Sequence, residues 1–143
     1  MKHINKSKLA SGERGGFTLI EMLVVIGMIG VLAAAVLTAL GPSRAKARDA
    51  RVISGLNQLA ALAEANFNGN SYLDETTFKT MQGVLPVYTD IEGVVGAGTV
   101  KYLGGATYAV FAPLASSGAY CIDSTGSRKT LTTVPTTAVS ACP

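Results

Sequence analysis

The chain has 143 residues, of which 48% are hydrophobic and 15% charged, and a formal net charge of +3. This length suits one modest domain plus an anchor, and the composition is unlike that of a disordered chain. The net charge lies entirely in residues 1–16, which hold four basic residues and one acidic residue, while the remainder holds eight of each. A general polyanion-binding role therefore gets no support from the pI of 9.0.

Residues 22–40, MLVVIGMIGVLAAAVLTAL, form an uncharged run in which Thr38 is the one polar side chain. As a helix, this run spans roughly 28 Å, close to the thickness of one hydrocarbon core. We therefore predict a membrane-spanning helix, and a core helix buried inside a domain is the alternative. Gly27 and Gly30 lower helix propensity, but glycine is tolerated in membrane helices and permits close backbone approach.

Gly41-Pro42 follows this run and interrupts the helical pattern. Proline lacks a backbone N–H and clashes with the preceding turn, so we predict a kink, a locally melted turn or a stop here. Beyond it, apolar side chains spaced by three or four residues predict an amphipathic helix, which ends at Asn68-Gly69-Asn70 with Gly69 as a left-handed cap. The stripe consists of Val52, Leu56, Leu59, Ala63 and Phe67, widened by Ile53 and Leu62.

The segment 71–93 carries mixed signals, and we predict a connecting region there. Four short runs beyond it are rich in Tyr, Val, Phe and Thr and are separated by turns rich in Gly and Ser. These runs are TVKYL (99–103), TYAVFA (107–112), AYCID (119–123) and TLTTV (130–134). We predict a meander of three or four antiparallel strands with one face packed on the apolar stripe. The fold class is thus α+β, a long N-terminal helix on a small antiparallel sheet.

The two cysteines, Cys121 and Cys142, both lie in the last quarter of the chain. Their spacing is not C-x-x-C, and the single histidine cannot complete a zinc site with them. If this region is exported, a disulfide between them is the natural interpretation. If it is cytosolic, two unrelated buried thiols are the alternative.

Glu21 stands at the head of the apolar run and needs an explanation. An ordinary secretory signal has small residues at a cleavage site after its apolar segment, and Ala33-Ala34-Ala35 would serve that purpose. A secreted globular protein released after Ala35 is therefore an alternative. This alternative gives no reason for Gly15-Gly16-Phe17. It also leaves Glu21 unexplained, because a glutamate near the start of a membrane helix costs about 1–3 kcal/mol unless it finds a partner.

Cleavage between Gly16 and Phe17 would create a new α-amine four residues from Glu21. In a stack of subunits, Glu21 of one could pair with the Phe17 amine of the next, so that an unpaired charge in lipid becomes a paired one. Such a pair would set the register of helix stacking.

The stretch GGFTLIEMLVVIGMIGVLA resembles the amino terminus of type IV pilins and pseudopilins. The resemblance implies a short basic leader that a prepilin peptidase cuts on the cytoplasmic side after Gly16. It also implies N-methylation of Phe17 and an assembly role for Glu21 as the fifth mature residue. ARDARVISGLNQLAALAEA and AYCIDSTG are also similar to pilins. One departure is that Pro42 falls a little later than the helix-breaking proline of many pilins.

The basic leader favours the cytoplasm, so the C-terminal part is expected to be exported, which favours the Cys121–Cys142 disulfide. This bond would close a loop of 20 intervening residues and stabilise the fold by roughly 3 kcal/mol; the resemblance implies that the loop is exposed on a fibre. The basic residues Arg44, Lys46, Arg48 and Arg51 would lie just outside the membrane, in solvent or against neighbouring subunits or lipid head groups. We predict a leader (1–16), a transmembrane assembly helix (17–41), an amphipathic helix (42–69) and a globular β head (70–143) with the disulfide loop 121–142.

The resemblance implies a structural subunit of a homo-oligomeric filament for adhesion, motility or DNA uptake. Such a subunit spans the cytoplasmic membrane once before assembly and is extracellular afterwards. Its implied partners are the membrane, the prepilin peptidase, and the assembly platform with its ATPases. The alternatives are a pseudopilin of a type II-like secretion system, a minor tip subunit of the filament, and a monomeric anchored receptor, for instance for nucleic acid.

We predict no enzyme, no cofactor and no metal. The only histidine, His3, lies in the predicted leader, so no His-based triad or general base remains. GVVGAGTVKYLGG lacks the last glycine of a dinucleotide-binding motif and is predicted as a loop leading into a strand. The acids Asp74, Glu75, Asp90 and Glu92 do not follow a calcium-loop spacing, although some pseudopilins bind calcium and a site there is the alternative. The five tyrosines are expected to be packing residues.

Overall fold

The computed structural model describes residues 16–136 and 139–143. The chain divides into two compact units, Met1–Thr38 and Ala39–Pro143. Most of the predicted leader, His3 included, therefore lies outside the described residues, and the first unit is described from Gly16 onward.

The first unit contains the beginning of helix α1, Leu19–Ala65. Its described residues, 16–38, are all exposed. This finding contradicts the alternative of a core helix buried inside a domain, because such a helix would have its apolar side chains covered by the rest of the chain. α1 is long and apolar enough to cross a membrane, and no residue of its apolar stretch is buried.

α1 remains helical at Gly41 and Pro42. The expectation of a stop or a melted turn is therefore wrong. A proline inside a helix removes one backbone hydrogen bond and costs about 3 kcal/mol. Alanine, the strongest helix former, is frequent on both sides, at Ala33 to Ala35, Ala39, Ala45 and Ala47, and favours helix across the proline.

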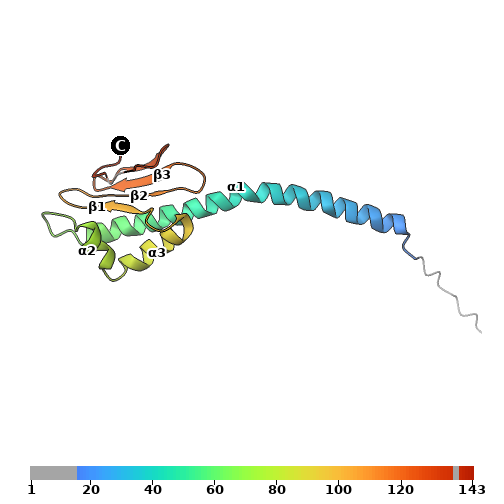
Figure 1. The fold of residues 1–143 in the computed structure, drawn as a ribbon, viewed down its shortest axis with the longest axis horizontal. Coiled ribbons are helices and arrows are strands. Elements are labelled where there is room, and N and C mark those ends of the chain that lie inside the picture. Colours follow the sequence, from blue (N-terminus) through green and yellow to red (C-terminus); the bar gives the residue numbers. More distant parts are fainter. Residues whose placement is uncertain (1–15, 137–138) are drawn as a thin grey trace, which may run out of the picture. The chain divides into compact units, whose positions relative to one another are not determined.

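The second unit combines the C-terminal part of α1 with two short helices and a four-stranded sheet (Figure 1). The short helices are α2, Glu75–Thr80, and α3, Val84–Val95. The strands are β1 (Lys101–Leu103), β2 (Ala109–Pro113), β3 (Ala119–Asp123) and β4 (Arg128–Leu131). They form an antiparallel meander in the order β1-β2-β3-β4, as predicted. The α+β fold class is thus confirmed.

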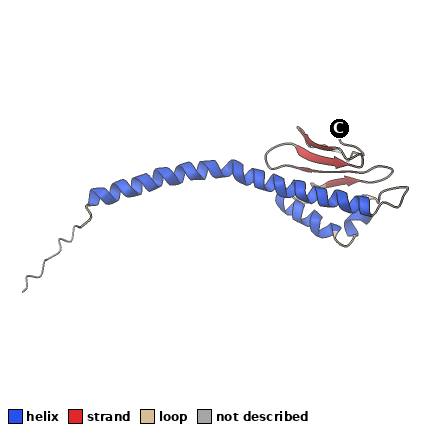
Figure 2. Ribbon diagram, turned by 180° about the vertical axis from the view of Figure 1, so that it is seen from behind, coloured by secondary structure: helices blue, strands red, loops and turns tan. Residues whose placement is uncertain are grey.

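In two opposite views, the sheet lies on one side of this part of α1 and the two short helices lie on the other (Figures 1 and 2). The predicted stripe faces the resulting core: Val52, Leu56, Leu59 and Ala63 are buried. Phe67 lies beyond the end of the helix at Ala65 and is 40% exposed. The sheet contributes Tyr102, Val110, Ala112 and Ile122, and Tyr108 directly before β2 joins them. The short helices contribute Phe78, Val84, Tyr88 and Ile91.

Aromatic rings join α2 to the edge strand β1. Phe78 stacks on Tyr102 with 4.4 Å between ring centroids, and Tyr88 meets Phe78 edge-on. Tyr88, Tyr102 and Tyr108 are all buried, so the prediction that tyrosines pack is confirmed for these three. Burial raises the pKa of Tyr102 to about 12.

Helices α2 and α3 lie in the segment predicted as a connecting region. α2 begins after Asp74, whose carboxylate accepts a hydrogen bond from the Thr77 N–H at 3.0 Å and so acts as an N-cap. Val84, Tyr88 and Ile91 are spaced by four and three residues and are buried on one side of α3. These signals are present in the sequence but each spans three turns or fewer.

Two glycines permit close approaches within the second unit. A Cβ atom on Gly55 would lie 2.6 Å from Ile91, so the glycine lets α1 and α3 pack closely. A Cβ atom on Gly104, in the β1–β2 turn, would overlap the backbone carbonyl of Leu73. Glycine is therefore required at both positions because a larger side chain would not fit, and not because of turn geometry.

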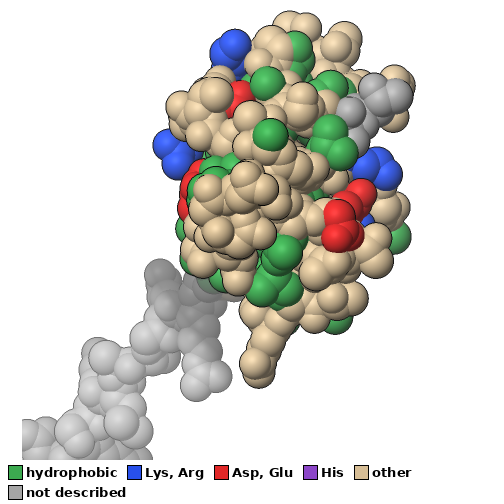
Figure 3. All heavy atoms as spheres, turned by 90° about the vertical axis from the view of Figure 1, so that its left-hand side faces the viewer, with side chains coloured by type: hydrophobic (Ala, Val, Ile, Leu, Met, Phe, Trp, Pro, Cys, Tyr) green, Lys and Arg blue, Asp and Glu red, His purple; other side chains and the backbone are tan. Residues whose placement is uncertain are grey.

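Figure 3 shows the side chains that one face of the second unit exposes to solvent. Hydrophobic side chains lie there in small separate groups between polar side chains and backbone. Such a distribution is ordinary for a surface exposed to water. It contrasts with the first unit, where large apolar side chains such as Leu19, Ile26 and Leu37 are more than half exposed.

Candidate functional site

The start of α1 is closed by reciprocal hydrogen bonds between Thr18 and Glu21. The Thr18 hydroxyl accepts from the Glu21 N–H at 3.3 Å, and Glu21 Oε2 accepts from the Thr18 N–H at 2.8 Å. The same oxygen accepts from the Thr18 hydroxyl at 2.8 Å. This arrangement is a capping box, which satisfies backbone donors that have no helical partner. The carboxylate also lies where the helix dipole favours negative charge.

The two carboxylate oxygens of Glu21 differ in what they contact. Oε2 takes both hydrogen bonds from Thr18, whereas Oε1 accepts none from the residues that the structure describes. One oxygen is therefore open to a further donor without loss of the cap. Glu21 was predicted to pair between subunits, and its local partner Thr18 was missed, although the T-x-x-E pattern before an apolar run signals such a cap.

The predicted cleavage site lies directly before this cap. Gly16 and Phe17 precede the helix, are not helical, and are exposed, Phe17 to 80%. An exposed, non-helical peptide is what a peptidase can bind. The structure thus brings Gly16, Phe17 and Glu21 together at one end of α1, with the peptide bond accessible.

An open apolar hollow lies beside Glu21. It is lined by Glu21 and by Phe17, Ile20, Val24, Val25 and Met28. Because no other described residue covers these side chains, a second apolar helix could pack there. A donor carried by that helix would then meet the open oxygen of Glu21 in surroundings with little water, where charge pairing is strong.

The predicted disulfide is present in the second unit, where Cys121 of β3 is bonded to Cys142. Cys121 is buried with Ala109 and Phe111 on the sheet face opposite α1, because alternate side chains of a strand point to opposite faces. Leu131, Val139 and Cys142 pack against this second cluster. The C-terminal segment therefore covers a face that would otherwise expose apolar side chains.

Asp123, at the end of β3, holds the same segment through a buried carboxylate. Its Oδ2 accepts from the Cys142 N–H at 2.9 Å. Its Oδ1 accepts from the Thr125 N–H, the Thr125 hydroxyl and the Ser127 N–H at 3.0, 2.6 and 3.2 Å. Burial raises the pKa of Asp123, but these hydrogen bonds outweigh it and hold the pKa below its usual value. Asp123 was not among the predicted site residues.

A second buried carboxylate, Asp49 of α1, fixes the β2–β3 turn. Asp49 Oδ1 accepts from the backbone N–H groups of Ala115 and Ser116 at 2.6 and 3.3 Å. It joins residues 66 and 67 positions apart along the chain, so no local pattern in the sequence predicts it. The contact ties the turn to the helix on which the sheet packs.

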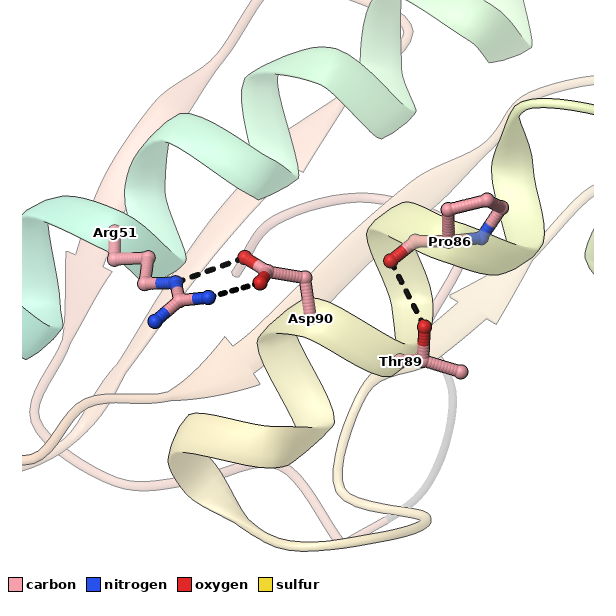
Figure 4. A network of polar contacts seen from close by, with 4 residues as sticks. All are labelled: Arg51, Pro86, Thr89 and Asp90. Atoms are coloured by element: carbon pink, nitrogen blue, oxygen red, sulfur yellow. Dashed lines mark hydrogen bonds and ion pairs between the residues drawn. The ribbon is translucent and has the colours of Figure 1, made fainter.

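The acids considered for a calcium site each have a structural partner. Asp74 caps α2, Glu75 pairs with Lys79 at 3.0 Å, and Glu92 accepts from the Gly98 N–H at 3.0 Å. Asp90 of α3 receives two hydrogen bonds from Arg51 of α1, one of them from Nε at 2.9 Å (Figure 4). The Arg51 guanidinium lowers the pKa of Asp90. Among the described residues, no three His, Cys, Asp or Glu side chains are grouped as metal ligands.

The start of α1 has the features of a prepilin-type amino terminus. A family model described as the prokaryotic N-terminal methylation motif matches residues 13–37, which include Gly16, Phe17 and Glu21. The prepilin leader motif of type IV pilins and pseudopilins is therefore confirmed. The motif indicates a type IV pilin-like or pseudopilin-type protein, which is a structural class. Comparisons of the chain with curated proteins and with solved structures gave no match.

Proposed function

We propose that the protein is the structural subunit of a type IV pilus-like extracellular filament that serves adhesion, motility or DNA uptake. The observation that carries this proposal is the arrangement of Glu21, with one carboxylate oxygen capping α1 and the other open beside apolar side chains. An anchor needs only an apolar helix. A carboxylate placed among exposed apolar side chains is costly in lipid and calls for a partner.

The partner is the amine of a neighbouring copy. Cleavage by the prepilin peptidase after Gly16 frees the α-amine of Phe17, which is then N-methylated. The amine of one copy donates to the open Oε1 of Glu21 in the next, while Oε2 keeps its hydrogen bonds to Thr18. Because apolar burial gains little when a helix leaves lipid, small residues such as Gly27 and Gly30 supply close helix packing and the charge pair supplies register.

Each segment of the chain has a role in such a filament. Residues 1–16 are the leader, 17–41 the assembly helix, 42–69 an amphipathic helix and 70–143 a head with the disulfide loop 121–142. The chain crosses the cytoplasmic membrane once before assembly, and the head becomes the outside of the filament. Addition to the filament requires an assembly platform and its ATPases.

Removal of the Glu21 carboxylate tests this proposal. We expect Glu21→Ala to reduce sheared surface filaments, imaged by electron microscopy and quantified by mass spectrometry, by at least about tenfold, the factor that corresponds to 1.4 kcal/mol. The amount of mature chain in the membrane should stay unchanged, because the apolar helix is intact. Glu75→Gln, which removes a partly buried carboxylate of the second unit that pairs with Lys79, is the matched control and should leave filaments at wild-type levels.

Wild-type filament yield from Glu21→Ala would contradict the proposal and favour a monomeric anchored protein. A mature chain that starts at Val36 would instead identify a secreted protein released after Ala35.

A further inference from the structure

Three cations of α1 lie just beyond the apolar run and lack an acidic partner. Arg44, Lys46 and Arg48 are exposed, and no carboxylate of the described residues forms an ion pair with any of them. The next cation along the helix differs, because Arg51 is held by Asp90. The unpaired set is therefore confined to one turn and a half of helix at the beginning of the second unit.

The three cations do not share one side of the helix. At about 100° per residue, Lys46 points roughly opposite to Arg44, while Arg48 lies close to the direction of Arg44. A neighbouring protein chain seated on one side of α1 would meet only part of this set. A layer of anionic groups that surrounds the helix would meet all three.

The distance from the apolar run fits the head-group layer of a bilayer. Arg44 lies about 6 Å and Arg48 about 12 Å along the helix axis beyond Leu40. The head-group region adds about 5–8 Å on each side of the hydrocarbon core. Helix side chains tilt toward the helix N-terminus, which here is toward the apolar run, and long Lys and Arg side chains reach back to the interface.

We propose that Arg44, Lys46 and Arg48 bind the phosphate groups of anionic lipids around α1, in the leaflet next to the second unit. This contact fixes the depth of the chain in the membrane before assembly. The inference rests on the proposed function only in that the apolar run spans a membrane. Arg51 is excluded from the set because Asp90 already neutralises it.

Lipid retention by the full mature chain tests the inference. The chain is inserted into nanodiscs that contain equal amounts of phosphatidylglycerol and phosphatidylcholine, and native mass spectrometry counts the lipids that stay bound after release. We expect the wild type to retain phosphatidylglycerol over phosphatidylcholine by at least about threefold, since each cation near an anionic surface adds to the attraction for anionic lipid. The triple variant Arg44→Gln, Lys46→Gln, Arg48→Gln should retain both lipids equally.

A charge-matched control separates this site from the net charge of the protein. Lys101→Gln, Arg128→Gln, Lys129→Gln removes three cations from β1 and β4 and should keep the wild-type lipid preference. Equal retention of the two lipids by the wild type would overturn the inference, as would loss of the preference in the control.

The outcomes also distinguish this inference from the proposed function. A chain that inserts into the nanodisc but shows no preference overturns only the lipid site. If the triple variant loses filaments while the wild type shows no preference, the cations bind neighbouring copies and the lipid assignment is wrong. Failure of the wild-type chain to insert would contradict the membrane anchor itself.

Discussion

Helix α1 passes through two different environments, and its two parts follow different rules. From Met22 to Leu37 it is apolar on all sides, and every residue is exposed. From Val52 to Ala63 it is apolar along one stripe, and that stripe is buried. The first pattern suits a helix whose surroundings are lipid or other copies of itself, and the second suits a helix with one partner face within its own chain. Both parts have high helix propensity. They differ in where polar side chains lie around the helix.

The glycines show the same contrast. A Cβ atom on Gly27 or Gly30 would contact nothing within 4 Å, whereas one on Gly55 or Gly104 would meet other parts of the second unit. Gly27 and Gly30 are thus free to serve contacts with other molecules. Gly55 and Gly104 are already used in the packing of the second unit.

The largest effect is expected from a methyl group at Gly104. Gly104→Ala would overlap the Leu73 backbone, which cannot move as a side chain can, and we expect a loss of more than about 4 kcal/mol of unfolding free energy, or failure to fold. Urea unfolding of the full chain in detergent micelles, followed by tyrosine fluorescence, measures this, since all five tyrosines lie in the second unit. Gly93→Ala, which adds a methyl group in open space in α3, should change stability little. Wild-type stability of Gly104→Ala would contradict the packing described.

The disulfide should have the next largest effect. We expect Cys121→Ser, Cys142→Ser to reduce the free energy of unfolding by roughly 3 kcal/mol, because the open chain gains conformational freedom when unfolded. The same micelle assay applies, with the wild type measured with and without a reductant. The helical signal of the chain in circular dichroism should persist in the variant, because α1 does not depend on this bond. A variant as stable as the wild type would show that the C-terminal segment is held by other contacts.

The Asp123 carboxylate should contribute next, in a manner that depends on pH. Asp123→Asn replaces a charged acceptor of backbone N–H groups, and we expect a loss of about 2 kcal/mol near pH 7. Because the native pKa lies below the usual value of 3.8, this contribution is complete above that value. It is lost as the pH falls through the lowered native pKa. Wild type and variant should therefore converge in stability in acid, and a constant difference down to pH 2 would contradict this account.

The smallest effect is expected from the Arg51–Asp90 pair. Both side chains are exposed, to 59% and 43%, and solvent screens such pairs so that they contribute little to stability. Arg51→Gln and Asp90→Asn should each reduce the unfolding free energy only slightly, and the double variant by little more than either alone. The differences should vanish in 1 M salt, where the Debye length is about 3 Å. Additive losses in the double variant would show that the two groups act independently.

Local patterns in the sequence predicted those elements whose apolar and polar residues follow a regular spacing. The period of the stripe from Val52 to Ala63 identified the buried side of α1, and alternation with turn residues identified all four strands. β4 begins earlier than predicted, at Arg128, because Arg and Lys have low strand propensity but tolerate an exposed edge. α2 and α3 were missed because each is short, and Pro86 and Gly83 obscure the pattern of Val84, Tyr88 and Ile91.

The candidate site could be predicted in part for a similar reason. Gly16, Phe17 and Glu21 lie within one short motif, so their association is local. The bond between Cys121 and Cys142 followed from their number once export was expected. Asp49 was missed because its partners at Ala115 and Ser116 are distant along the chain. Asp123 has local partners at Thr125 and Ser127, but its hydrogen bond from Cys142 depends on the tertiary fold. A polar residue buried by distant contacts leaves no periodic signal in the sequence.

The intact mass of the mature chain, extracted from membranes and from filaments, tests the central claim most directly. We predict that both forms begin at Phe17 and carry one methyl group on its amine, because this amine is the proposed partner of Glu21. A chain that retains residues 1–16 in the filament, or one that begins at Val36, would contradict the account.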